Sequence, residues 1–214
     1  MTDFNKLTPE PSIEIFSGFG NAVSVYEDFM AVGIPFSDSL GRGVGLVKLY
    51  QLVNNQWINV ATLNPKVVYE GMRFGTTLHL SNNYLLIGSQ HNKGIVHLFK
   101  KQGNNWASST ELTILSNSFA TNFGTYHNNN LEISDDENII AIADVNYSDA
   151  TMPRDRRGAI FIYQKMNNDE WINQTTPFVL KAFEKDIADF VSSGIIIKGN
   201  RLFTGTAFTN AGTI

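Results

Sequence analysis

The side chains best suited to binding lie in one polar segment, residues 144–157, which holds three arginines, three aspartates and a tyrosine. Arginine and tyrosine are over-represented among the residues that carry the binding energy of protein interfaces, and long loops often bear such residues. Asp144 and Asp149 could also join a cation site. The alternative is a solvated loop in which arginines and aspartates pair with negligible effect on stability. The candidate binding residues are Asp144, Tyr147, Asp149, Arg154, Asp155, Arg156 and Arg157.

Catalytic chemistry has no comparable set of convergent groups. The four histidines, at 79, 91, 97 and 127, form no His-x-x-x-His or His-Glu pair, and the sequence has no Gly-x-Ser-x-Gly motif, Walker loop or dinucleotide fingerprint. The close glycines of residues 41–45 precede an expected strand rather than a helix, so they cannot offer a helix N-terminus to a phosphate. The absence of cysteine excludes thiolate zinc sites and cysteine nucleophiles. We expect no enzyme activity, no cofactor and no metal centre.

Composition narrows the class of protein further. The chain has 214 residues with 43% hydrophobic and 17% charged residues, and its 17 glycines and 15 phenylalanines are typical of a turn-rich β protein. The net charge of -4 argues against nucleic acid as a partner. No apolar stretch approaches the roughly 20 residues of a membrane helix, and residues 1–5 lack the pattern of a signal peptide. We therefore expect no insertion into a membrane.

The elements that must position these side chains come from an internal repeat. A Phe-Gly dipeptide recurs at Phe19-Gly20, Phe74-Gly75 and Phe123-Gly124, with a weakened copy at Phe190-Val191, in steps of 55, 49 and 67 residues. The three tryptophans each follow a conspicuous glycine (Gly45, Gly94 and Gly158) by 12, 12 and 13 residues; they are Trp57, Trp106 and Trp171. A period of this length is typical of propellers and solenoids.

Each repeat predicts four short antiparallel strands. The first alternates in polarity, as at 22–26 and 77–80, and a polar turn links it to a nearly continuous apolar second strand, as at 29–32 and 84–87, which should lie in the middle of its sheet. The third strand alternates again, and a short fourth strand carries the tryptophan. The sequence predicts an all-β propeller of four-stranded blades, with three complete repeats and a partial fourth. The repeats span residues 19–63, 74–112, 123–180 and 190–214.

The pattern of Phe-Gly, an apolar strand, Gly33-Ile34-Pro35 and a later Gly-x-Val and Trp resembles the FG-GAP repeat. That family builds the seven-bladed propeller of integrin α chains and bacterial surface propellers, so the resemblance implies an extracellular or cell-surface setting and partners bound at the rim. It also implies calcium loops between first and second strands. The matching turns here lack the Asp-x-Asp-x-Asp-Gly spacing, and only Asp135, Asp136 and Glu137 gather acids.

Closure of the ring is the open question of this prediction. Residues 11–16 are placed to supply a closing outer strand. The fourth repeat stops two residues into its third strand, which would leave an unpaired edge. Either the chain is a fragment of a larger ring, or it associates with other copies to complete one.

The repeated tryptophans allow two interpretations. Their constant register favours a structural role, with each packing an outer strand against its neighbour. Repeated aromatic residues could also form sugar platforms, as in propeller lectins. His79 and His97 fall on expected strands, where they should lie between blades or on a groove wall. We therefore expect a non-catalytic binding or adhesion module that recognises a protein through the loop at 144–157; the alternatives are a carbohydrate-binding propeller and a scaffold domain of a larger enzyme or surface protein.

Overall fold

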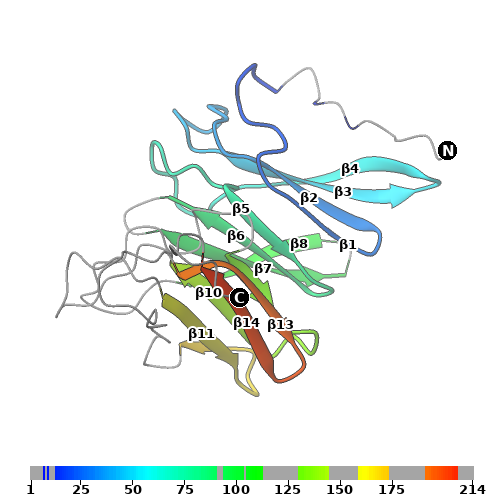
Figure 1. The fold of residues 1–214 in the computed structure, drawn as a ribbon. Coiled ribbons are helices and arrows are strands. Elements are labelled where there is room, and N and C mark those ends of the chain that lie inside the picture. Colours follow the sequence, from blue (N-terminus) through cyan, green and yellow to red (C-terminus); the bar gives the residue numbers. More distant parts are fainter. Residues whose placement is uncertain are drawn as a thin grey trace.

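The computed structural model describes residues 7, 9, 13–90, 94–103, 105–112, 130–144, 159–173 and 191–206. All regular structure in these residues is β, with the strands paired antiparallel in three four-stranded sheets and one two-stranded sheet (Figure 1). Within the same residues there is no α-helix, and so none that could span a membrane. The predicted all-β class is confirmed.

Each sheet is built from consecutive strands, in the order of the sequence. Sheet 1 holds β1 (Val23–Tyr26), β2 (Phe29–Ile34), β3 (Leu46–Val53) and β4 (Gln56–Leu63). Sheet 2 holds β5 (Thr77–Leu80), β6 (Tyr84–Ser89), β7 (Ile95–Gln102) and β8 (Asn105–Leu112). Sheet 3 holds β9 (Leu131–Ile133), β10 (Ile139–Asp144), β11 (Ala159–Lys165) and β12 (Trp171–Asn173). Sheet 4 holds β13 (Val191–Lys198) and β14 (Arg201–Thr206).

The strands follow the predicted repeat closely. The apolar second strand of each of the first three repeats lies between the first and third strands, and β6 is buried along its whole length. One prediction was wrong: the fourth strand is not short in sheets 1 and 2, where β4 and β8 each have eight residues. A β-bulge at Leu49/Tyr50 and another at Leu98/Phe99 let these long strands keep pairing.

The sheets follow one another in space as they do in sequence. First strands are neighbours: β1 contacts β5, β5 contacts β9, and β9 contacts β13. The main apolar clusters lie between consecutive sheets, one between sheets 1 and 2, one between sheets 2 and 3, and a smaller one between sheets 3 and 4. The core is therefore a series of layers, each shared by two sheets. The described residues form no closed ring.

The Phe-Gly dipeptide of the second repeat lies in the layer between sheets 1 and 2. Phe74 is fully buried and packs edge-on against His97 and Phe99. Gly75 passes so close to sheet 1 that a Cβ added at Gly33 would overlap its carbonyl oxygen, and a Cβ at Gly45 would overlap that of Phe74. Glycine is thus needed at these positions because two backbones meet there.

The segment expected to close the ring lies partly outside the described residues. Residues 13–16, its described part, form a bend and a turn and belong to no strand. The side chains of Ile15 and Phe16 are exposed. Phe123 and Gly124, the dipeptide of the third repeat, lie outside the described residues.

Candidate functional site

Two loops at one end of sheets 1 and 2, residues 35–45 and 64–73, are joined along their backbones. The amide of Gly71 donates to the carbonyl of Arg42 at 2.8 Å, and the amide of Arg73 donates to that of Gly43 at 3.0 Å. The amide of Phe74 continues the pattern to the carbonyl of Val44 at 2.7 Å. The backbone hydrogen bonds therefore hold the two loops together as one ordered unit.

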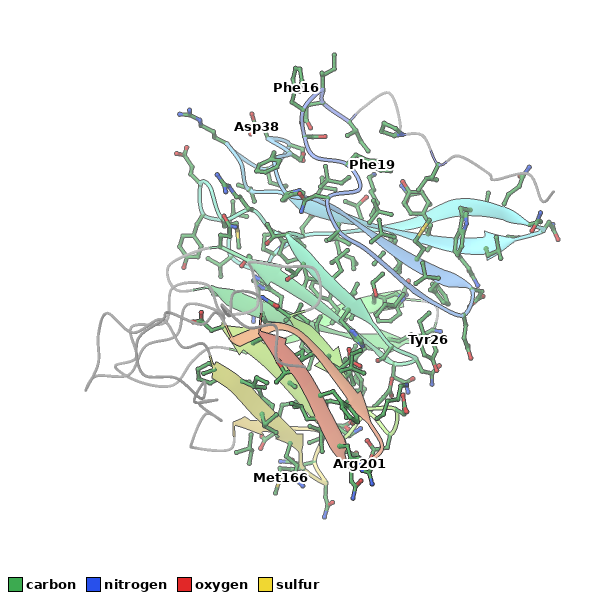
Figure 2. The ribbon with its side chains drawn as sticks, in the orientation of Figure 1. Phe16, Phe19, Tyr26, Asp38, Met166 and Arg201 are labelled. Atoms are coloured by element: carbon green, nitrogen blue, oxygen red, sulfur yellow. The ribbon has the colours of Figure 1, made fainter. Side chains whose placement is uncertain are left out.

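The first of these loops is also fixed internally. Asp38 accepts a hydrogen bond from the amide of Gly43 at 2.6 Å through Oδ1, and Gly45 donates to the carbonyl of Ser37 at 3.0 Å. Phe36 donates from its amide to Ser17 at 2.9 Å, which ties the loop to the N-terminal segment. Figure 2 shows Asp38 near Phe16, at the opposite end of sheet 1 from Tyr26.

This unit presents apolar and cationic side chains to solvent. The guanidinium of Arg73 lies 5.3 Å from the ring centroid of Phe36, and its Nη1 donates to Gln90 Oε1 at 2.9 Å. Tyr69 is 42% exposed and Phe36 43%, large fractions for aromatic residues. We call this set the rim patch; it consists of Phe36, Leu40, Val67, Val68, Tyr69 and Arg73.

The sequence predicted the loop at 144–157 as the binding surface and not these two loops. Of the seven predicted binding residues only Asp144 is described: it ends β10, pairs with Ala159 and is fully buried. A buried carboxylate cannot form part of an exposed recognition surface, so Asp144 is removed from the candidate set. Tyr147, Asp149, Arg154, Asp155, Arg156 and Arg157 lie outside the described residues. The signal missed was the run of three large residues at 67–69.

The acidic turn of the third repeat lies between first and second strands, where the family resemblance implies calcium. Its three carboxylates make separate contacts. Asp135 pairs with Lys198 at 3.1 Å, while Ser134 donates to Asp136 at 2.6 Å, and this hydrogen bond is the main cause of the lowered pKa of Asp136. The described residues contain no group of three or more His, Cys, Asp or Glu that could hold a metal ion.

Glu137, the third of these acids, ties sheet 3 to sheet 2. Its carboxylate accepts hydrogen bonds from the hydroxyl of Ser81 and from the amide and side chain of Asn83, each at 2.7 Å. The acceptor therefore lies in one strand-turn-strand unit and its donors in the equivalent turn of the preceding one.

The tryptophans of sheets 2 and 3 pack between sheets, in the same way in both. Trp106 meets Phe29 of sheet 1 edge-on at 6.2 Å between centroids, and Trp171 meets Tyr84 of sheet 2 edge-on at 5.6 Å. Phe29 and Tyr84 both begin the second strand of their sheet. Trp57 instead packs in a small cluster with Met30, Val32 and Tyr50 of its own sheet. Trp106, which is 9% exposed, has no free face to offer a sugar.

A line of polar contacts crosses the first strands. Ser24 Oγ of β1 accepts from the amide of Leu80 in β5 at 2.9 Å, and Glu132 of β9 accepts from the amide of Ile197 in β13 at 3.4 Å. Between them, His79 Nδ1 lies 3.3 Å from Glu132 Oε2. By strand register Ser24, His79 and Glu132 occupy the same position of successive sheets. In both hydrogen bonds the acceptor at this position meets the amide one residue further along the first strand of the next sheet. Neighbouring sheets are therefore offset from each other in the same way.

Burial keeps two histidines neutral at pH 7. Desolvation lowers the pKa of both His79 and His97 to about 4, and it raises that of Glu132. His97 is fully enclosed between sheets, with Nε2 2.9 Å from Ser89 Oγ.

We expect the free energy of unfolding to fall as the pH is lowered from about 6.5 to about 4. In this window the unfolded chain protonates both histidines while the folded chain does not. The cost at about pH 4 is about 3 kcal/mol for the fully buried His97 and less for His79, whose imidazole lies beside the Glu132 carboxylate. The raised pKa of Glu132 acts in the opposite direction and offsets part of the loss. Guanidinium unfolding at a series of pH values measures the slope. His97→Gln should make it shallower, and an unchanged slope would contradict the assignment.

Comparison with known proteins adds no relative. No protein-family model matches this chain, and a search of curated proteins finds no significant match. The likeness to FG-GAP repeats therefore rests on the recurring residues of the sequence itself.

Proposed function

We propose that the four sheets are blades of a β-propeller and that the chain is a non-catalytic module that binds a protein partner through its rim. The blades in this proposal follow each other around an axis lined by β1, β5, β9 and β13. Support comes from the contacts that recur between sheets: neighbouring first strands, an edge-on tryptophan and a side chain that accepts from the next sheet's backbone. Radial repetition of this kind builds propellers.

The observation that carries the binding function is the rim patch on its two joined loops. Exposed aromatic and arginine side chains are the residue types that anchor protein interfaces, and their backbone is already ordered, so binding loses little conformational entropy. The loop at 144–157 joins this rim in the proposal, with Tyr147, Asp149, Arg154, Asp155, Arg156 and Arg157 as further contacts. The extracellular or cell-surface setting belongs to the same proposal and rests on the family resemblance alone.

The carbohydrate-binding alternative rested on the repeated tryptophans, and it gains no support from Trp106 or Trp171. A sugar platform needs an exposed aromatic face, and the indoles of Trp106 and Trp171 are engaged by Phe29 and Tyr84. A scaffold role without a ligand of its own would leave the exposure of the rim patch unexplained.

We expect the double variant Phe36→Ala, Tyr69→Ala to lose its partner while remaining folded. Both side chains are exposed, so their removal should change the melting temperature little, whereas truncating an interface anchor costs about 2 kcal/mol or more, roughly 30-fold in affinity. Proteins retained by the immobilised chain from an extract of its source would be quantified by mass spectrometry and the leading one titrated by calorimetry.

Two further variants complete this experiment. Val60→Ala, an exposed valine of β4 outside the two rim loops, is the matched control and should bind as the parent does. The triple change Arg154→Ala, Arg156→Ala, Arg157→Ala tests the other loop separately. Equal affinity of the parent and the Phe36/Tyr69 variant would refute the role of the rim patch.

A further inference from the structure

The first sheet exposes positions that are buried in the sheets that follow it. Val23 and Val25 of β1 are 52% and 54% exposed. By strand register their counterparts in sheets 2 and 3 are Leu78, Leu80, Leu131 and Ile133, all buried against the preceding sheet. We call the side of sheet 1 that bears Val23 and Val25 its front face. It is the side that would meet a preceding sheet.

Sheet 4 exposes, on its opposite face, a position that is buried in the sheets before it. Phe203 of β14 is 53% exposed. Its register counterparts in the other three sheets, Ala31, Leu86 and Ala141, are fully buried against the sheet that follows. We call the side of sheet 4 that bears Phe203 its back face. Each contact between consecutive sheets joins the back face of one sheet to the front face of the next. In the described residues the front face of sheet 1 and the back face of sheet 4 are the two faces left without such a partner sheet.

The contact around the tryptophan shows how the two open faces differ from the faces that meet inside the described chain. Between internal sheets a lysine accompanies the tryptophan: Lys101 Nζ lies 4.3 Å from the centroid of Phe29, and Lys165 Nζ lies 5.4 Å from that of Tyr84. Each lysine is paired with the tryptophan of its own sheet. The contacts between sheets 1 and 2 and between sheets 2 and 3 therefore each consist of an indole and an ammonium group covering one aromatic ring.

At the two ends both sides of that contact change together. In sheet 1 the residue paired with Trp57 is Leu52, where sheets 2 and 3 have lysine. In sheet 4 the residue that begins the second strand is Arg201, where sheets 1 and 2 have an aromatic ring and sheet 3 has Ile139. Placing sheet 1 behind sheet 4 would set Trp57 over Arg201, a cation–π contact, and would avoid the repulsion between a lysine and that arginine.

The front face of sheet 1 is only partly covered by its own chain. Leu7 packs with Met30, Tyr50 and Trp57 on the half nearer the outer strand. The half formed by Val23 and Val25 stays open. A sheet that docks on this face would cover Val23 and Val25, and it would displace Leu7 from the half that Leu7 now covers.

We propose that the front face of sheet 1 is the docking surface for the back face of sheet 4 of a second copy of this chain. The contact is head to tail, and two such contacts related by a two-fold axis close a pair of copies with eight sheets, which is within the range of propeller rings. The occupant is a second copy rather than an unrelated protein because two changes compensate for each other: Leu52 stands where sheets 2 and 3 have lysine, and Arg201 stands where sheets 1 and 2 have an aromatic ring.

The mass in solution tests the pairing. Light scattering on the full chain should give twice 23.8 kDa at high concentration, with dissociation on dilution. Val25→Lys and Phe203→Lys each charge one of the two faces and should each leave a particle of 23.8 kDa with an unchanged circular dichroism spectrum. A parent chain that stays monomeric up to about 1 mM overturns the proposal and leaves the face to another protein.

Charge exchange tests the particular contact. Leu52→Lys should weaken the pair about tenfold by placing like charges together. Adding Arg201→Tyr to that variant restores the arrangement of the internal contacts and should restore the affinity. A double variant that dimerises no better than Leu52→Lys alone would show that these residues do not meet. Association of Val25→Lys as tightly as the parent would likewise place the interface elsewhere.

Discussion

Trp106→Ala should lower the free energy of unfolding by about 3 to 5 kcal/mol, the cost of truncating a well-buried large aromatic side chain. Trp106 contributes to the cluster shared by sheets 1 and 2 and meets Phe29 edge-on, so its removal opens a cavity between two sheets. Guanidinium unfolding followed by far-ultraviolet circular dichroism gives the value.

Trp57→Ala is the matched control for this experiment. Trp57 has the same place in its repeat but lies in the small cluster on the outer side of sheet 1, only partly buried. In dilute solution its truncation should therefore cost clearly less than that of Trp106. Equal losses for the two variants would mean that the tryptophan serves its own sheet and that the inter-sheet contact contributes little.

Gly33→Ala should destabilise the protein by about 3 kcal/mol or prevent its folding, because the new methyl group would overlap the backbone of Gly75. A backbone carbonyl cannot rotate aside as a flexible side chain would, so sheets 1 and 2 would have to separate. The variant's melting temperature, or its yield of soluble protein, measures the effect.

The fourth sheet provides the control for this glycine. Gly205 has the register position of Gly33, yet a Cβ there meets no atom within 4 Å. Gly205→Ala should therefore be neutral within about 0.5 kcal/mol. The third sheet agrees with this view. Its residue at the register position of Gly33 is Ala143, and the repeat that follows has Phe190-Val191 in place of Phe-Gly, so both glycines of the close approach are replaced together. A tolerated Gly33→Ala would contradict the close approach of the two backbones.

The strands were predictable because their signals are local. Each Phe-Gly dipeptide, apolar second strand and tryptophan has a fixed spacing in the chain, and these spacings fix the order of strands within a sheet. The length of β4 and β8 was underestimated because a bulge lets a strand continue past a break in the alternating pattern.

The site was less predictable because it depends on contacts between distant residues. The exposure of Phe36 and Tyr69 follows from two loops that meet through the backbone, about thirty residues apart. Similarly, nothing near Glu137 in the sequence points to Ser81 and Asn83 as its donors. The burial of Asp144 was missed for the same reason, since its acidic character favoured a position in solvent.

The central claim is that sheets 1, 2 and 3 repeat one contact with each other, and nuclear Overhauser effects from the indole protons test it most directly. The chain has three tryptophans, so their signals are readily assigned by substitution. We predict cross-peaks from Trp106 to the ring of Phe29 and from Trp171 to the ring of Tyr84. Cross-peaks from Trp106 and Trp171 to residues of their own sheets alone would contradict it.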